Sequence, residues 1–427
     1  MLQTIYRGLT ELGGPAIRLL VARRRAAGKE DPLRQHERFG VASRPRPAGP
    51  LVWCHAASVG ESLSLLALVR RLLDARPELS VLVTTGTVTS ARLMGERLPE
   101  RAFHHYAPID RMPWVRRFLD HWRPDLAVWT ESEFWPNVLS ELRRRKVPAA
   151  LINARMSSRS FRNWQRAPGL IGPLLAGFRL CLAQTETEAD RLRRLGAAAA
   201  SCIGNLKYSA DPLPADPQAA DALRRAIGGR PAWLLASSHP GEEAIAARVH
   251  AELSGRVPGL LTIAAPRHPH RGAEVADAFA ALGLRATLRS AGALPQPGDD
   301  VYVADTMGEL GLFYRLSPVV CVGGSLVPFG GHNPVEPAQL GAALVYGPHM
   351  TNFAEITAEL EAAGGALAVP DAGALTAALA RLLADGGERD RMAAAAAAVA
   401  ERNRAVVERV LGALEPLLAE AGIGARP

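Results

Sequence analysis

The chain has 427 residues, of which 48% are hydrophobic and 22% charged, a balance typical of a globular protein that excludes a disordered or collagen-like chain. This length predicts two or three domains that bury enough surface to fold without disulfides. The net charge of +8 rests on arginine, because lysine occurs only at Lys29, Lys146 and Lys207, and it fits nucleic acid, an anionic membrane or phosphorylated substrates.

The N-terminal segment, residues 1–30, combines apolar residues at helical spacing with a closing run of arginines. The apolar positions are Leu2, Ile5, Leu9 and Leu12, and residues 23–25 are all arginine. This pattern indicates an amphipathic helix on a membrane face with its arginines at anionic headgroups; the alternative is a helix packed on its own domain. The sequence has no uninterrupted run of 18 apolar residues, so a spanning helix is not expected. It also has no small-residue cleavage site after an apolar core, so a signal peptide is not expected.

From residue 50 onward, short apolar runs alternate with helical patterns, which predicts doubly wound parallel sheets covered by helices. Strands of a first unit are expected at residues 51–55, 81–85, 102–106, 126–130, 149–153 and 180–184. Residues 211–230, rich in Pro, Asp, Ala and Gly, read as a linker. Strands of a second unit are expected at residues 233–236, 260–264, 302–304, 319–322 and 343–346, and one long helix over the alanine-rich residues 391–418.

Two such units facing one another would place a ligand cleft between the carboxyl ends of both sheets. The chain has no G-x-G-x-x-G after its first strand and no G-x-x-x-x-G-K-[ST], which disfavours a dinucleotide dehydrogenase and a P-loop NTPase. Its four cysteines are far apart and lack the spacing of a zinc site, so reduced thiols and no metal are expected.

In the first unit, candidate catalytic side chains follow the strands. Glu61 lies at a helix start after the first strand, where it is either a ligand-facing carboxylate or a cap of the helix dipole. Glu131 and Glu133 follow the fourth strand, and strand alternation predicts that both point to one side, with Arg155 as a neutralising cation. The alternative is a surface turn with acidic caps. Lys207 ends the unit as either a functional ammonium or ordinary interface charge.

In the second unit, four strand-to-helix turns carry small residues, glycines and cations. The turn at residues 236–243 offers a backbone N–H pocket for an anion, and the turn at residues 264–271 offers arginines and histidines as a phosphate clamp. Residues 305–311 and the glycine-dense Val322–Pro337 add two more helix starts, where Glu336 could accept hydrogen bonds from ribose. Four such turns at one sheet edge predict a nucleotide site.

Ten sequence blocks together resemble the 3-deoxy-D-manno-octulosonic acid (Kdo) transferases of lipopolysaccharide synthesis. In chain order over about residues 45–360 they are WCHAASVGES, TTGTVTSA, WTESEFWPNVL, INARMSSRS, AQTETEADRLRRLGA, GNLKYS, ASSHPGEE, PRHPHR, DTMGELGLFY and GGHNPVEPA. The resemblance implies a GT-B type glycosyltransferase with two facing Rossmann-like domains and an N-terminal amphipathic helix. Its inverting, metal-independent reaction would move Kdo from CMP-Kdo to the lipid A precursor (lipid IVA) at the cytoplasmic face of the inner membrane, without a cofactor.

The same resemblance assigns roles and domains by motif. Glu61 would be the general base, while Glu131 and Lys207 would support the transition state. CMP would contact Pro266, Arg267, Met307, Gly308, Glu309, Asn333, Pro334, Val335 and Glu336. Residues 1–30 would associate with the membrane, residues 31–210 would bind the acceptor, and residues 211–427, with the C-terminal helix, would bind CMP-Kdo.

Two rival functions stay open at this point. One is another GT-B-like sugar-nucleotide enzyme, such as a UDP-sugar transferase or an epimerase, since the fold hosts many reactions. The other is a nucleic-acid-binding protein, but the chain lacks the aromatic-interleaved basic stripe of such a surface, so no nucleic-acid partner is expected.

Overall fold

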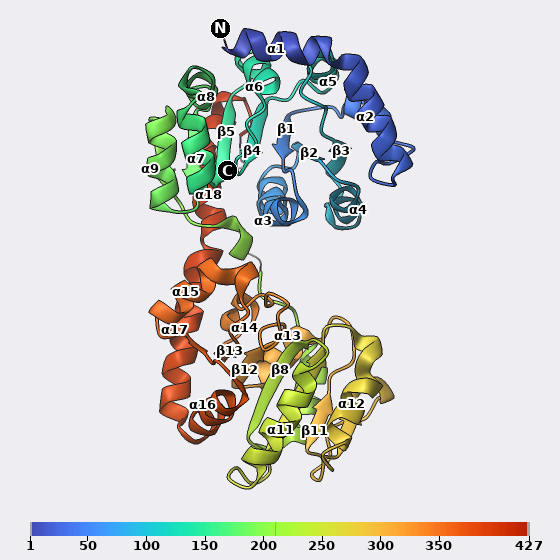
Figure 1. The fold of residues 1–427 in the computed structure, drawn as a ribbon, viewed down its shortest axis with the longest axis vertical. Helices are drawn as coiled ribbons and strands as arrows, with labels where there is room; N and C mark the ends of the chain where they lie inside the picture. Colours follow the sequence, from blue (N-terminus) through green and yellow to red (C-terminus); the bar gives the residue numbers. More distant parts are fainter. Residues whose placement is uncertain (1, 210, 425–427) are drawn as a thin grey trace. The chain divides into compact units, whose positions relative to one another are not determined.

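The computed structural model describes residues 2–209 and 211–424 and divides into two compact units (Figure 1). Unit 1 comprises Met1–Ala210 and Asn403–Pro427, and unit 2 comprises Asp211–Arg402. Each unit contains one seven-stranded sheet in which every strand pair is parallel. The predicted class of two doubly wound α/β domains is therefore confirmed.

The sheet of unit 1 has the strand order β3-β2-β1-β4-β5-β6-β7. The strands are β1 Leu51–His55, β2 Ser80–Thr85, β3 Ala102–Tyr106, β4 Leu126–Thr130, β5 Ala149–Ala154, β6 Leu180–Ala183 and β7 Ala200–Cys202. The first six lie where the sequence predicts strands, because strands covered on both faces read as continuous apolar runs. The short β7 was missed, since two of its three residues are exposed.

Helices cover both faces of this sheet. They are α1 Leu2–Leu12, α2 Gly14–Ala26, α3 Val59–Ala75, α4 Val88–Arg97, α5 Met112–Trp122, α6 Pro136–Arg144, α7 Ser158–Gln165, α8 Pro168–Leu175, α9 Glu186–Leu195 and α18 Val406–Glu420. Alternation along β1 points Trp53 into one apolar core with α5, α6 and α8. It points Val52 and Cys54 into the opposite core with α3 and α18.

The sheet of unit 2 has the order β10-β11-β9-β8-β12-β13-β14. Its strands are β8 Ala232–Ser238, β9 Leu261–Pro266, β10 Ala286–Leu288, β11 Val301–Val303, β12 Val319–Val322, β13 Ala343–Tyr346 and β14 Ala366–Ala368. Its helices are α10 Pro217–Ile227, α11 Glu242–Ser254, α12 Gly272–Ala280, α13 Leu310–Leu316, α14 Val335–Gln339, α15 Ala354–Ala362, α16 Ala372–Ala384 and α17 Gly386–Arg404. The edge strands β10 and β14, each three residues long, were not predicted.

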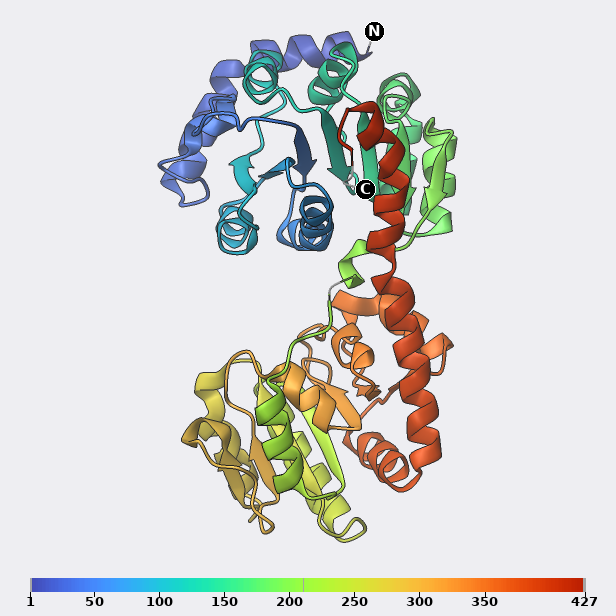
Figure 2. The same cartoon turned by 180° about the vertical axis from the view of Figure 1, so that it is seen from behind.

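The C-terminal residues differ from the predicted domain boundary. The second domain was expected to run to residue 427, whereas Asn403–Pro427 belongs to unit 1. The reason is hydrophobic burial, because α18 places Val406, Val410 and Leu414 in the apolar core under α3. The single helix expected over residues 391–418 is two helices, α17 and α18, and Figure 2 shows α18 in dark red beside the sheet of unit 1.

The predicted linker also contains regular structure. Asp216 accepts a hydrogen bond from the amide of Gln218 at the start of α10, and Gly228 ends the helix in the left-handed region at φ +62°. Leu223 and Ile227 are buried. Residues 217–227 therefore form a packed helix of unit 2, which sequence composition alone did not reveal.

The N-terminal segment forms two helices that pack on unit 1 through polar contacts. Tyr6 of α1 donates a hydrogen bond to Asp110 at 3.0 Å. The apolar side chains face away, with Leu9 66% and Leu12 84% exposed. Over residues 2–209 and 211–424, no helix has the length and apolar character needed to cross a bilayer.

Candidate active site

The Glu61 carboxylate lies at the carboxyl edge of the first sheet, in the first turn of α3. Ser58 caps this helix by accepting a hydrogen bond from the Glu61 amide. Oε2 of Glu61 accepts the Ala57 amide at 2.8 Å and lies 3.3 Å from the Thr130 hydroxyl. In the part of the chain that the structure describes, Oε1 accepts no hydrogen bond. One oxygen is thus fixed, while the other can accept a proton.

Glu131 follows β4, the neighbour of β1 in the sheet. Its backbone is in the left-handed region at φ +53°, and its amide donates to the Ile152 carbonyl at 3.2 Å. Among the described residues, its carboxylate makes no hydrogen bond or ion pair. The pKa of Glu131 is raised to about 7, mainly by burial and then by the nearby charge of Glu61.

Two cations and a further carboxylate share this sheet edge with Glu131. Arg155 follows β5 and Lys207 lies in the short helix after β7, and both lower the pKa of Glu131, while Glu188 of α9 raises it. The structure therefore brings Glu61, Glu131 and Lys207 into one electrostatic neighbourhood. It also places the predicted cation Arg155 close enough to act on Glu131.

The prediction that strand alternation points Glu131 and Glu133 to the same side is wrong, because neither residue lies in a strand. Strand β4 ends at Thr130, and the left-handed backbone at residue 131 interrupts the alternation. Glu133 accepts a hydrogen bond from the indole of Trp135 at 2.8 Å. The like charge that raises the pKa of Glu131 comes instead from Glu61, in the first turn of the helix α3 that follows the adjacent strand β1.

Three amide side chains hold the loops that carry these charged residues: Asn153, Gln184 and Asn205. They were not identified from the sequence. Asn153, at φ +50°, accepts the Leu206 amide at 2.9 Å. Gln184 donates to the Asn153 carbonyl at 3.0 Å, and Asn205 donates to Gln184 at 3.1 Å. The segment GNLK is thereby tied to β5 and β6, which fixes the backbone that carries Lys207.

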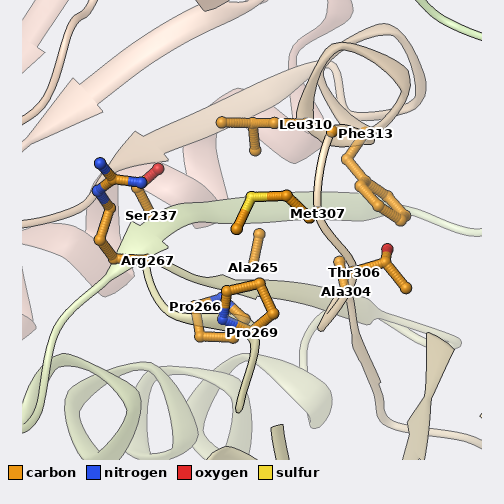
Figure 3. A pocket seen from close by; sticks show the side chains of 11 residues that line it. Ser237, Ala265, Pro266, Arg267, Pro269, Ala304, Thr306, Met307, Leu310 and Phe313 are labelled. Carbon is orange, nitrogen blue, oxygen red and sulfur yellow. The ribbon is translucent and has the colours of Figure 1, made fainter. Parts of the chain in front are cut away.

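In unit 2, a pocket opens at the carboxyl ends of β9 and β11 (Figure 3). Of the predicted CMP-binding residues, Pro266, Arg267, Met307 and Gly308 line it. Figure 3 shows Arg267 and Ser237 on one side of the pocket, Phe313 on the other and Met307 between them. Its walls of apolar side chains and one guanidinium fit a base and an acidic group.

The remaining predicted CMP-binding residues do not line this pocket. Glu309 forms a two-pronged ion pair with Arg289 at 2.7 and 3.0 Å, and this partner lowers the pKa of Glu309. Asn333, Pro334, Val335 and Glu336 surround the start of α14. Burial raises the pKa of Glu336, while Asn333 and the charge of Arg267 lower it. The charge of Arg267 therefore reaches Glu336 at the start of α14 as well as the pocket that Arg267 lines.

Two anion-binding features expected from the sequence are already occupied by the chain's own carboxylates. The buried Glu242 accepts hydrogen bonds from the amides of Gly324, Ser325 and Leu326 in the glycine-dense loop, and from the amide of His239 in the turn at residues 236–243. These amides cannot also bind a ligand. The predicted backbone pocket is therefore filled by an internal hydrogen-bond network.

Arg271 is likewise unsuited to the predicted phosphate clamp. It is paired with Glu243 at 2.9 Å and with Glu274 at 2.6 Å. Arg267 behaves differently, since its guanidinium has no hydrogen bond or ion pair within the described residues. Of the two arginines, Arg267 is the one with donors available to a ligand. Among residues 2–209 and 211–424, no group of three or more His, Cys, Asp and Glu side chains could hold a metal ion.

The family model and the curated relatives that match this chain carry the same description. A family model described as 3-Deoxy-D-manno-octulosonic-acid transferase (kdotransferase) matches residues 34–210. The 3-deoxy-D-manno-octulosonic acid transferase of Bordetella pertussis is 36% identical over 417 residues, which are 95% of this chain and 96% of that protein. The protein of the same name from Rickettsia bellii (strain RML369-C) is 34% identical over 352 residues, 82% of this chain and 84% of that protein. A solved glycosyltransferase structure from Rickettsia africae ESF-5 has a TM-score of 0.55 at 12% identity, covering 87% of this chain and 99% of that chain, and shows the fold alone.

Proposed function

The chain belongs to the 3-deoxy-D-manno-octulosonic acid (Kdo) transferases, which are glycosyltransferases, and on this premise we propose that it moves Kdo from CMP-Kdo to the lipid A precursor lipid IVA. The observation that carries the proposed mechanism is the carboxylate of Glu61, which has one oxygen fixed by Ala57 and the other without a partner in the described chain. A general base needs this combination of a fixed position and a free lone pair.

The proposed reaction is a single inverting displacement. The acceptor hydroxyl oxygen forms a bond to the anomeric carbon of Kdo while the bond from that carbon to the phosphate oxygen of CMP breaks. The hydroxyl proton passes to Oε1 of Glu61, and the bonding electron pair leaves with CMP. The free enzyme regains its carboxylate when Glu61 releases the proton to water.

Glu131 and Lys207 support the transition state in this proposal. The Glu131 carboxylate has no direct partner among the described residues, so an approaching positive charge gains a strong interaction with it in a half-buried site. The Lys207 ammonium, exposed at the same sheet edge, is suited to a phosphate of the acceptor or of the donor. The basic balance of the chain fits such anionic substrates.

We place the reaction at the cytoplasmic face of the inner membrane. The support is the N-terminal segment, in which α1 exposes Leu2, Ile5, Leu9 and Leu12 and α2 ends in three consecutive arginines. Apolar side chains beside cations match the boundary between acyl chains and anionic headgroups. Peripheral attachment through this segment would bring the enzyme to its lipid acceptor.

Transfer from CMP-Kdo to tetraacylated lipid A precursor in detergent, with products identified by mass, tests the function. Glu61→Gln should abolish transfer while CMP binding, measured by calorimetry, survives. Glu96→Gln, which removes an exposed carboxylate of α4, serves as the matched control and should transfer normally. Substantial turnover by Glu61→Gln would remove Glu61 from the base role, and a clear preference of the enzyme for UDP over CMP would refute the proposed donor.

A further inference from the structure

Two histidines that the proposed mechanism leaves unused meet at the centre of the second sheet's carboxyl edge. His239 follows β8 and His332 follows β12, which are neighbouring strands. Their Nε2 atoms lie 2.9 Å apart, and their rings are nearly parallel, 9° from coplanar orientation. The ring of Phe329 stacks on His239 at 3.7 Å. Residues 93 positions apart are thus joined in one defined arrangement.

The hydrogen bond between the two rings fixes where a proton is available. One Nε2 must donate and the other must accept, so the accepting ring carries its proton on Nδ1. Neither Nδ1 has a partner within the described residues. The pair therefore always presents at least one N–H that no group of the described chain uses, and a second one when the pair gains a proton.

The charges around the pair are mainly positive. The pKa of His332 is lowered to about 4, mainly by burial and then by His239, Arg267 and His268. The pKa of His239 is lowered by burial and by His268, Arg267 and Arg271, while Glu243 raises it. An anion brought to this position would meet cations and polarised N–H groups.

Side chains are the donors invoked for such an anion, because four of the neighbouring backbone amides are already occupied. Glu242 accepts the amides of Gly324, Ser325 and Leu326 in the glycine-dense loop and the amide of His239 in the turn before α11. Arg271 is bound by Glu243 and Glu274. The two histidines and Arg267 are donors at this edge that no group of the described chain occupies on their Nδ1 and guanidinium atoms.

The pair also lies beside the pocket on the same sheet edge. The pocket is lined from the ends of β9 and β11, and it includes Ser237 at the end of β8 and Arg267 just after β9. The strands lie in the order β11-β9-β8-β12. The pocket lies at the ends of β11 and β9, Arg267 follows β9, and the two histidines follow β8 and β12. A ligand whose base enters the pocket would extend its next groups over Arg267 toward the pair.

We propose that His239, His332 and Arg267 form an anion-binding subsite for the acidic group of the donor that lies beyond its nucleoside. This inference rests on the proposed sugar-nucleotide function of unit 2. The shared chemistry is an oxyanion, supplied either by the phosphate of the nucleotide or by the carboxylate of the transferred sugar acid. Charge-assisted hydrogen bonds from Arg267 and one or both imidazoles would hold it.

Calorimetric titration of the full chain with cytidine, CMP and CMP-Kdo tests the subsite. For His332→Gln and His239→Gln, we expect cytidine to bind as it does to the wild type and the acidic ligands to bind about tenfold or more weakly, the loss typical of one charge-assisted hydrogen bond. If the variants bind both CMP and CMP-Kdo more weakly, the subsite is assigned to the phosphate. A loss seen only with CMP-Kdo assigns it to the sugar carboxylate.

A control and a second readout separate binding from folding. His36→Gln removes a histidine of unit 1 that pairs with Ser43 and should leave all three affinities unchanged. Proton uptake on binding, measured in buffers of different ionisation heat, should be present in the wild type and reduced in His332→Gln, a change that a purely structural role would not produce. Unchanged affinity for all ligands, or an equal loss for cytidine, would overturn the subsite. Absence of CMP binding by the wild type would instead overturn the proposed donor.

Discussion

Replacing Glu131 by glutamine should stabilise unit 1, and the gain should depend on pH. The pKa of Glu131 is raised from 4.5 to about 7 in the folded chain, mainly by burial and then by the charge of Glu61. The folded state therefore holds a proton that the unfolded state has lost between about pH 4.5 and 7, so stability falls as the pH rises through this window. Above about pH 7 the full destabilisation is present.

The size of this effect follows from the two pKa values. A rise from 4.5 to about 7 corresponds to about 3 kcal/mol at about 1.36 kcal/mol for each pKa unit. Because the side chain is only half-buried, water screens part of this energy, and we expect about 1.5–2 kcal/mol for Glu131→Gln at about pH 8 and almost none at about pH 4. Glutamate and glutamine both carry a Cβ and a Cγ, so the left-handed backbone at φ +53° costs about the same with either residue.

Urea unfolding followed by tryptophan fluorescence measures this difference, since Trp233 alone of the seven tryptophans belongs to unit 2. Glu133→Gln is the matched control, because it removes a carboxylate of the same turn that already accepts the Trp135 indole. A loss of stability in Glu131→Gln, or a gain of equal size at both pH values, would refute the reasoning that burial and Glu61 raise the free energy of the ionised carboxylate.

Three further predictions concern charged groups of unit 1. Lys207→Gln removes one of the cations that lower the pKa of Glu131, so the stability loss associated with Glu131 should extend to higher pH and become larger in the same unfolding series. Arg144 holds the pKa of Glu141 at about 2, so Glu141→Gln should destabilise the chain above about pH 4.5, with the loss fading on acidification toward pH 2; a loss independent of pH would contradict the ion-pair explanation. Asp110 accepts the amides at the start of α6 at 2.9 and 3.0 Å, and Asp110→Asn should lower the free energy of unfolding by about 1 kcal/mol, whereas an unchanged urea midpoint would deny this carboxylate a capping role.

The positions of most strands follow from the sequence. Strands buried on both faces must be apolar at every position, as in LVWCH at residues 51–55 and VVCV at residues 319–322, and such runs are visible without any knowledge of packing. The parallel arrangement follows from the helices between them. The parallel arrangement in turn predicts that Glu61 and Glu131 lie at the same edge of the sheet, since each follows the carboxyl end of a strand.

Short or exposed elements could not be predicted in this way. β7, β10 and β14 have three residues each and expose part of their surface, so they carry no clear apolar run. The assignment of α18 to unit 1 depends on which apolar surface is free to accept it. That surface is formed by α3 and the first sheet, which end more than 200 residues before α18 begins.

The sequence by itself determined the α/β class, the family and the residues available at the sheet edges, because these depend on periodicity and local motif. Only the tertiary structure decided which of those residues have donors or lone pairs left for a ligand. Arg267 and Arg271 stand four positions apart, yet only Arg271 is neutralised, by Glu243 and Glu274. The His239–His332 contact likewise joins two distant turns. Hydrogen-bond partners are set by distances in space, and the order of residues along the chain does not specify those distances.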